Sequence, residues 1–161
     1  MKIILAGEPL SQIRMKFSSR GGFVKVYDPR AKDKKRIKEE IDSYVKRLYK
    51  DFKFFEHPRV SFIFHMPIPK GIPKRMASLY SSGTLKHEKK PDVDNLIKLT
   101  LDCMSGILFE DDKLVSFGPC VKLYHPEPKT IIYMTELADI VQQHEVDSLV
   151  WSDLFEPKLC K

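Results

Sequence analysis

Two aspartates one residue apart, Asp92 and Asp94, open the stretch DVDNLIKLTLDCM, directly after a basic pair and a proline. A second acidic group, Glu110 to Asp112, follows further along the chain. If these side chains meet, like charges about 4 Å apart repel by roughly 4 kcal/mol at an effective dielectric of about 20. Such a cluster needs a shared proton or a cation. Oxygen ligands without His or Cys nearby favour magnesium or manganese over zinc, and a carboxylate-bound dication amid basic residues is apparatus for phosphodiester hydrolysis.

Each of these residues also has a plainer interpretation. Asp92 or Asp94 can cap a helix that begins here, where the helix dipole favours acid. Lys98 lies four residues after Asp94 and therefore on the same helical face. It can form a weak ion pair with Asp94 or contact the scissile phosphate. Asn95 can orient a carboxylate or serve as a cap.

Basic residues outnumber acidic ones by 28 to 22, which gives a formal charge of +6 and suits a polyanionic partner. Two polar, basic segments concentrate this charge, and a solvated loop is the alternative for the second of them. The candidate phosphate contacts are Arg14, Lys16 and Arg20 in the first segment and Lys70, Lys74, Arg75, Lys86, Lys89 and Lys90 in the second.

The spacing of apolar residues predicts the elements that position these groups. Alternation and strong β formers predict strands over 2–6, 23–27, 60–66, about 114–123 and 130–135. Helical spacing predicts helices from Pro29 to Phe52 and from about 92 to 105, with Gly106 ending the second. We expect loops over 7–22 and 70–90. The order β-β-α-β-α-β-β predicts a single α+β domain, a mixed sheet packed with two main helices, over 1–136. Residues 137–161 form an amphipathic C-terminal extension that suits a helix.

Several classes of protein fit poorly. No apolar run reaches the length of a membrane span, and no leader is evident, so we expect a cytoplasmic protein. Three widely spaced cysteines argue against disulfides or a structural zinc site. No Gly-rich loop joins a strand to a helix, as a nucleotide-binding fingerprint requires.

The stretch KPDVDNLIKLTLDCMSGILFEDDKLV resembles the core of the RusA family of Holliday-junction resolvases, small endonucleases often carried by phages and prophages. The family pattern has a basic residue, Asp-x-Asp-Asn-Leu-x-Lys, a helix containing an Asp, and an Asp-Asp turn before a strand. The resemblance implies metal-binding carboxylates at Asp92, Asp94 and Asp112, with Asp111 beside them, and a catalytic lysine at Lys98. The segment PLSQIRMKFSSRGG loosely resembles the family's Pro-then-basic loop after the first strand.

The resemblance further implies a bacterial or phage-encoded homodimer that requires magnesium or manganese. Its two sites would nick symmetric strands of a four-way DNA junction, since a twofold protein matches a branched DNA of similar symmetry. Two alternatives stay open: a non-catalytic basic module that binds branched or duplex DNA, and a magnesium-dependent phosphohydrolase of nucleotides. The latter would need a phosphate-cradling loop or an enclosed pocket.

Overall fold

The computed structural model describes residues 1–20, 23–82, 86–137 and 147–148. Its elements follow the order β-β-β-α-β-α-α-β-β, with a short 3-10 turn before the last two strands. Their bounds are β1 Lys2–Ala6, β2 Lys16–Arg20, β3 Phe23–Tyr27, α1 Ala31–Leu48, β4 Pro58–Pro67, α2 Lys74–Ser81, α3 Val93–Met104, η1 Asp112–Leu114, β5 Ser116–His125 and β6 Lys129–Glu136. The predicted α+β class with a mixed sheet is confirmed.

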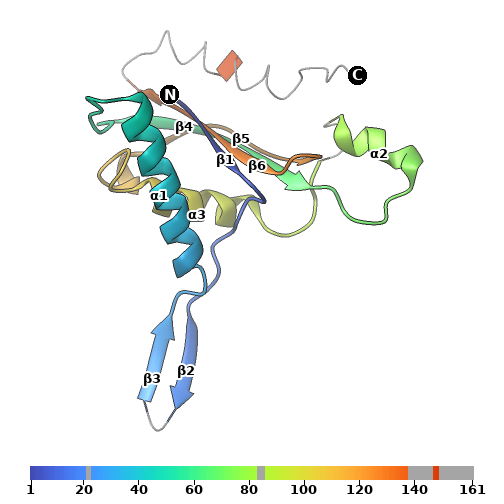
Figure 1. Ribbon diagram of the computed structural model, residues 1–161, viewed down its shortest axis with the longest axis horizontal. Helices are drawn as coiled ribbons and strands as arrows, with labels where there is room; N and C mark the ends of the chain where they lie inside the picture. The colour runs from blue at the N-terminus through green and yellow to red at the C-terminus, as the bar shows by residue number, and fades with distance from the viewer. Residues whose placement is uncertain (21–22, 83–85, 138–146, 149–161) are drawn as a thin grey trace.

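A four-stranded sheet in the order β1-β6-β4-β5 forms the centre of the fold. β6 runs antiparallel to both β1 and β4, whereas β5 runs parallel to β4. The apolar sequence of β4, PRVSFIFHMP, places buried residues on both faces of the sheet, which suits a central strand. Figure 1 shows α1 and α3 together on one side of this sheet.

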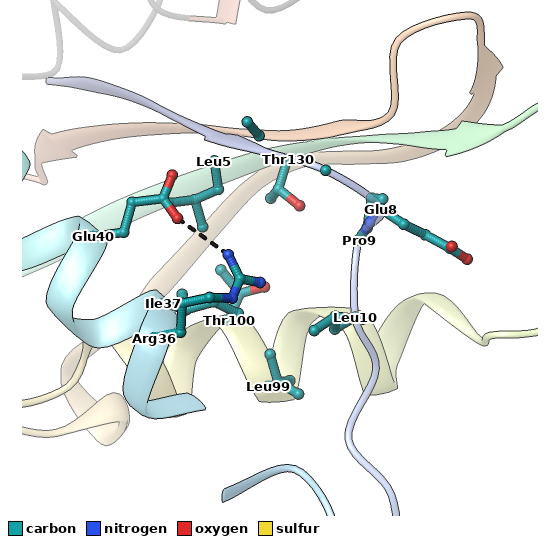
Figure 2. A pocket seen from close by; sticks show the side chains of 12 residues that line it. Leu5, Glu8, Pro9, Leu10, Arg36, Ile37, Glu40, Leu99, Thr100 and Thr130 are labelled. Carbon is teal, nitrogen blue, oxygen red and sulfur yellow. Dashed lines mark ion pairs between the residues drawn. The ribbon is translucent and has the colours of Figure 1, made fainter. Parts of the chain in front are cut away.

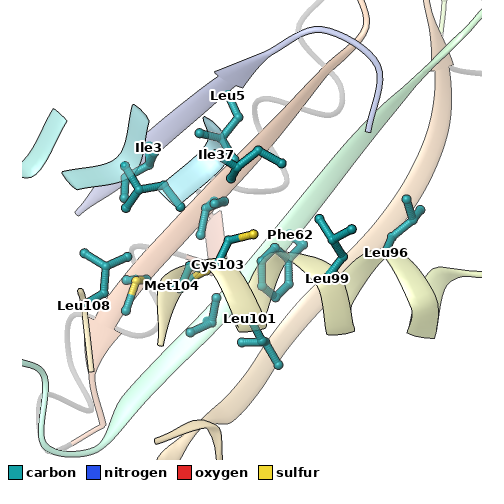
Figure 3. Packing of buried hydrophobic residues seen from close by; sticks show 14 of the residues in the cluster. Ile3, Leu5, Ile37, Phe62, Leu96, Leu99, Leu101, Cys103, Met104 and Leu108 are labelled. Atoms are coloured by element: carbon teal, nitrogen blue, oxygen red, sulfur yellow. The ribbon is translucent and has the colours of Figure 1, made fainter. Parts of the chain in front are cut away.

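The main core lies between the sheet and these two helices. Helix α1 contributes Ile37, Ile41 and Val45, which recur every four residues and so share one face. They pack with β1, with alternate residues of β4 and with the buried side of α3 (Figure 3). A smaller cluster of Ile63, Ile131 and Tyr133 lies on the opposite face of the sheet. The core therefore fixes α3, whose first turn carries Asp94, against the sheet.

Two predicted loops contain regular structure instead. The 7–22 loop contains β2, which pairs with β3 in an antiparallel hairpin. The 70–90 loop contains α2, which begins directly after Pro73. Helix α1 ends at Leu48, earlier than the predicted Phe52, because the backbone at Tyr49 is no longer helical.

The ends of the other elements agree with the sequence pattern. Gly106 follows α3 with φ of 77°, in the left-handed region where glycine carries no steric cost.

Of the predicted C-terminal extension, 138–146 and 149–161 lie outside the described residues, so its helix and the domain boundary after Glu136 stay predictions. Asp147, which is described, pairs with Arg59 of β4 at 2.8 Å.

Candidate nuclease site

The aspartate pair lies at the N-terminus of α3. Asp92 occupies the position just before the helix, with extended backbone (φ −71°, ψ 148°), and its side chain makes no capping hydrogen bond. Asp94 lies in the first turn, and both side chains are exposed. The capping interpretation of Asp92 is therefore not realised, and both carboxylates are open to a ligand.

Two neighbours of the pair lie as the helical spacing predicts. The side-chain amide of Asn95 donates to Oδ1 of Asp94 at 3.2 Å, so Asn95 contacts a candidate ligand carboxylate. Lys98 lies one turn further along α3 and is exposed. Within the described ranges, no ion pair joins Lys98 to Asp94, and its ammonium is free to meet an anion.

The second acidic group lies beyond the other end of α3. Oδ1 of Asp111 accepts the backbone N–H of Lys113 at 3.0 Å, and its Oδ2 lies 3.3 Å from the Lys113 ammonium. These contacts, the backbone hydrogen bond above all, lower the pKa of Asp111 below its ordinary value. Asp112 is exposed and begins η1.

The structure does not bring the two acidic groups together in one chain. Helix α3 has 12 residues, so its ends lie about 18 Å apart. Among the residues with described placement, no three His, Cys, Asp or Glu side chains gather as a metal-binding group. The described residues of one chain therefore do not form the carboxylate cluster considered in the sequence analysis: Asp92 and Asp94 lie at the start of α3, and Asp111 and Asp112 follow its end.

Lys122 of β5 holds the segment before Asp92 in place, and sequence reasoning missed it. Its ammonium donates to the carbonyl of Lys89 at 2.9 Å and to that of Pro91 at 2.7 Å. A bridge between Lys86 and Leu123 attaches the same segment to β5. The sequence gives one indication that Lys122 has a structural role: it is a single lysine inside the half-buried stretch CVKLYH.

Most of the basic candidates are exposed. Lys89 and Lys90 directly precede Pro91 and the aspartate pair, and Lys86 forms an isolated bridge to Leu123 of β5. Arg14 and Lys16 lie at the start of the hairpin, Lys70 follows β4, and Arg75 lies in the first turn of α2. Arg20 ends β2 and Lys74 begins α2, but their side chains lie outside the described part.

His87 belongs to the segment before Asp92 and lies beside Lys122 of β5. The centroid of its ring lies 4.6 Å from that of Tyr124, and its backbone N–H donates to the backbone carbonyl of Lys122 at 3.4 Å. Burial, followed by the positive charge of Lys122, lowers the pKa of His87 below its ordinary value of 6.5. The imidazole therefore favours its neutral form in the folded chain.

Asp102 does not pair with Lys98, although it lies one turn further along α3. It accepts from Lys34 of α1 at 2.8 Å, and Lys34 also contacts Asp28 at 3.0 Å. This ion triad ties the base of the hairpin, α1 and α3 together. Its three residues do not lie at the i to i+4 spacing of one helix, so the sequence pattern could not predict it.

The site is an open surface. The cavity in Figure 2, between β1, α1 and α3, measures about 20 Å³, enough for about one water molecule. A second cavity of about 420 Å³ lies along β1 and α1. Neither is lined by Asp92, Asp94 or Lys98. An open site suits a polymeric substrate better than an enclosed nucleotide.

Comparison with known proteins identifies the family of the chain. The chain is 26% identical over 141 residues to a protein of Bacillus subtilis (strain 168) named "Uncharacterized protein YqaN", a match covering 86% of this chain and 97% of that protein. In the described part, no helix is both long and apolar enough to cross a membrane. The family model described as Endodeoxyribonuclease RusA matches residues 6–135. This range contains all the elements from β2 through β5 and includes the aspartate pair. The chain therefore belongs to the RusA family of endodeoxyribonucleases.

Proposed function

We propose that this protein is a magnesium-dependent endonuclease that resolves four-way DNA junctions by paired, symmetric cuts during recombination and repair. The observation that carries the proposal is the state of Asp92 and Asp94. Both carboxylates are exposed at the start of a helix that the core holds in place, and neither is used for capping. Family membership supports the substrate class.

The donor set fits magnesium in kind and in number. Magnesium is commonly bound by one or two carboxylates, while water and substrate phosphates complete its shell. Manganese accepts the same oxygen ligands. When bound, such an ion activates water and stabilises charge on the attacking and leaving oxygens.

The chain's own residues then have separate tasks. Asp92 and Asp94 bind the ion, and Asn95 orients the Asp94 carboxylate through their 3.2 Å contact. Lys98, one turn along the same face, meets the scissile phosphate and offsets its negative charge. Lys89 and Lys90 contact neighbouring phosphates, which position the DNA without reading its sequence.

A homodimer gives Asp111 and Asp112 a place in the reaction. Because no three acidic side chains gather as a metal-binding group among the described residues of one chain, we assign Asp112 to the site of a second copy. A twofold dimer would then hold two shared sites, one for each of the two strands to be cut.

Mixing inactive variants tests this arrangement. Asp94→Asn and Asp112→Asn chains are combined, allowed to exchange, and assayed on a junction. In a shared site, one of the two sites in each mixed dimer contains only native residues, so single-strand nicking returns. If each site is built from one chain, both sites remain damaged and no activity returns.

A supercoiled plasmid with an extruded cruciform tests paired cutting. We expect the wild-type protein with magnesium to produce linear plasmid, because both strands are cut before the dimer leaves. Relaxed circles as the sole product would contradict paired resolution, and uncut plasmid with both magnesium and manganese would contradict the nuclease proposal.

The second candidate is a basic DNA-binding module without catalysis. It is favoured by the absence of a three-ligand group among the described residues of one chain. Thermal melts separate the two functions, because an ion that binds the folded state raises the melting temperature by mass action. A module predicts the same melting temperature with magnesium or EDTA, for both the wild type and Asp94→Asn.

A further inference from the structure

The face of the sheet turned away from α1 and α3, here called the second face, is buried. Ile63 of β4 points to this side, because its neighbours Phe62 and Phe64 pack in the core beneath the helices. Ile131 and Tyr133 of β6 form one cluster with Ile63. Ile63 is 0% exposed and Tyr133 4% exposed. Water therefore does not reach this cluster, although α1 and α3 lie on the other side of the sheet (Figure 1).

Helix α2 also meets the sheet on the side of the helices. Tyr80 of α2 contacts Tyr124 of β5, with ring centroids 4.8 Å apart. Tyr124 is paired with Met66, which belongs to the core beneath the helices. A sheet face that is open to water usually carries polar side chains, whereas the Ile63 cluster is apolar. The second face therefore has the composition of a surface that is packed against another segment.

Asp147, in the C-terminal extension, lies on the second face. Its Oδ2 is 2.8 Å from Nη2 of Arg59, which precedes Ile63 by four residues and so points to the same side of β4. Gly118 of β5 leaves room for the carboxylate, since a Cβ there would overlap the Ser61 hydroxyl and lie 3.4 Å from Oδ1 of Asp147. That Oδ1 atom is shielded from solvent. The carboxylate therefore occupies a recess between the starts of β4 and β5.

The length and composition of the extension suit the second face. Its first residue, Leu137, donates its backbone N–H to the carbonyl of His57 at 2.8 Å, so the extension leaves β6 at the end of the sheet where Arg59 lies. Shortly after Asp147 the sequence reads LVWSDLF over 149–155, in which five of the seven residues are apolar. The four strands of the sheet, about 4.8 Å apart, span about 14 Å, and seven residues reach up to about 23 Å. This run is therefore long enough to cross the sheet from the recess.

We propose that the C-terminal extension, residues 137–161, binds the second face within its own chain, with Asp147 as its ionic anchor and 149–155 packed over the Ile63 cluster. The Arg59–Asp147 pair joins residues of one chain, which favours this occupant over a second copy. An apolar face offers no cations to phosphates, which disfavours a nucleic acid. The matched family range ends at residue 135, so the extension adds a contact beyond the family domain. The proposal is independent of the proposed function.

Trp151 is the only tryptophan in the sequence, so its fluorescence reports on the extension in the full chain. We expect its emission in buffer to lie at shorter wavelength than in urea, and acrylamide to quench it less in buffer than in urea. Hydrogen exchange then tests the anchor. Because a partly exposed ion pair contributes about 0.2–1 kcal/mol, peptides covering 149–155 should exchange about 1.5 to 5 times faster in Asp147→Asn.

Two further variants locate the anchor and control for the loss of charge. Asp147→Arg sets two cations against each other and should speed exchange over 149–155 beyond the effect of Asp147→Asn. Combining it with Arg59→Asp restores an ion pair of reversed polarity and should bring exchange back toward the wild-type rate. Asp51→Asn, at an exposed aspartate in the turn after α1, is the matched control and should leave these peptides unchanged.

The outcomes decide between this occupant and others. Quenching of Trp151 that is equal in buffer and in urea would overturn the proposal, and so would exchange over 149–155 that is the same in Asp147→Arg as in Asp51→Asn. If Trp151 becomes accessible when dilution turns a dimer into a monomer, as followed by sedimentation, the extension binds a second copy and the proposal also fails. These measurements use neither DNA nor metal, so a failure here leaves the nuclease proposal standing, and an uncut junction leaves this proposal standing.

Discussion

Replacing Lys122 by methionine isolates the contacts that position Asp92. The substitution keeps a long apolar side chain but removes the ammonium that donates to the carbonyls of Lys89 and Pro91. Hydrogen bonds from charged groups contribute about 1.5–3 kcal/mol each. Because the bond to Lys89 is exposed and that to Pro91 only partly buried, we expect a local loss of about 1–3 kcal/mol for the pair. Every 1.4 kcal/mol is about a tenfold change in an equilibrium, so segment 86–91 opens roughly 5 to 150 times more often.

Hydrogen exchange followed by mass spectrometry measures this opening directly. In Lys122→Met we expect faster exchange in peptides covering 86–96, while peptides from β4 and β6 exchange as in the wild type. Junction cleavage should slow with little change in junction affinity, because Asp92 is no longer held in place. Lys122→Arg retains a donor and should recover part of the rate, and Lys35→Met serves as the exposed control. Unchanged exchange over 86–96 together with a wild-type cleavage rate would refute the positioning role.

Three further predictions concern the body of the protein. Lys34→Met leaves the carboxylates of Asp28 and Asp102 without their shared cation. We expect it to lower the free energy of unfolding, measured by urea titration, by about 2 kcal/mol. An unchanged urea midpoint would show that the triad contributes nothing to stability. Burial and Lys122 lower the pKa of His87, so the unfolded chain takes up this proton first as the pH falls below 6.5, and stability is lost toward acid. His87→Gln should therefore lose less stability than the wild type between pH 7.5 and 5.5, and an equal loss in both would contradict the shift. Burial raises the pKa of the Cys103 thiol to about 11, so iodoacetamide at pH 8 should label Cys103 only after denaturation, as read by peptide mass spectrometry; rapid labelling of the native protein would contradict its burial.

The main elements of the fold could be predicted from the sequence because the core imposes its periods on the chain. Leu96, Leu99, Thr100 and Cys103 recur at helical spacing, and β4 and β6 are rich in β-branched and aromatic residues. The hairpin strand β2 was not predicted because KFSSR has one apolar residue and packs against no core. Helix α2 was not predicted because three nearby prolines indicated irregular structure, although Pro73 directly precedes a helix.

The candidate site could be predicted only in part. Spacing along one helix placed Asp94, Asn95 and Lys98 correctly relative to each other, because i to i+4 relations are local. The relation of Asp112 to Asp94 depends on tertiary structure, and the described residues of one chain do not bring them into a metal-binding group. Lys122 and the Lys34 triad join residues distant in sequence, so no local pattern could reveal them.

The most direct test of the nuclease proposal is the single-turnover cleavage of an end-labelled four-way junction in magnesium. We predict cuts at symmetric positions by the wild type, and a rate lower by on the order of 100-fold or more for Asp94→Asn, with junction affinity and melting temperature retained. Asp51→Asn, at an exposed aspartate in the turn after α1, should cut like the wild type. Wild-type protein that binds junctions but cuts none in magnesium or manganese, or Asp94→Asn that cuts at the wild-type rate, would contradict the proposal.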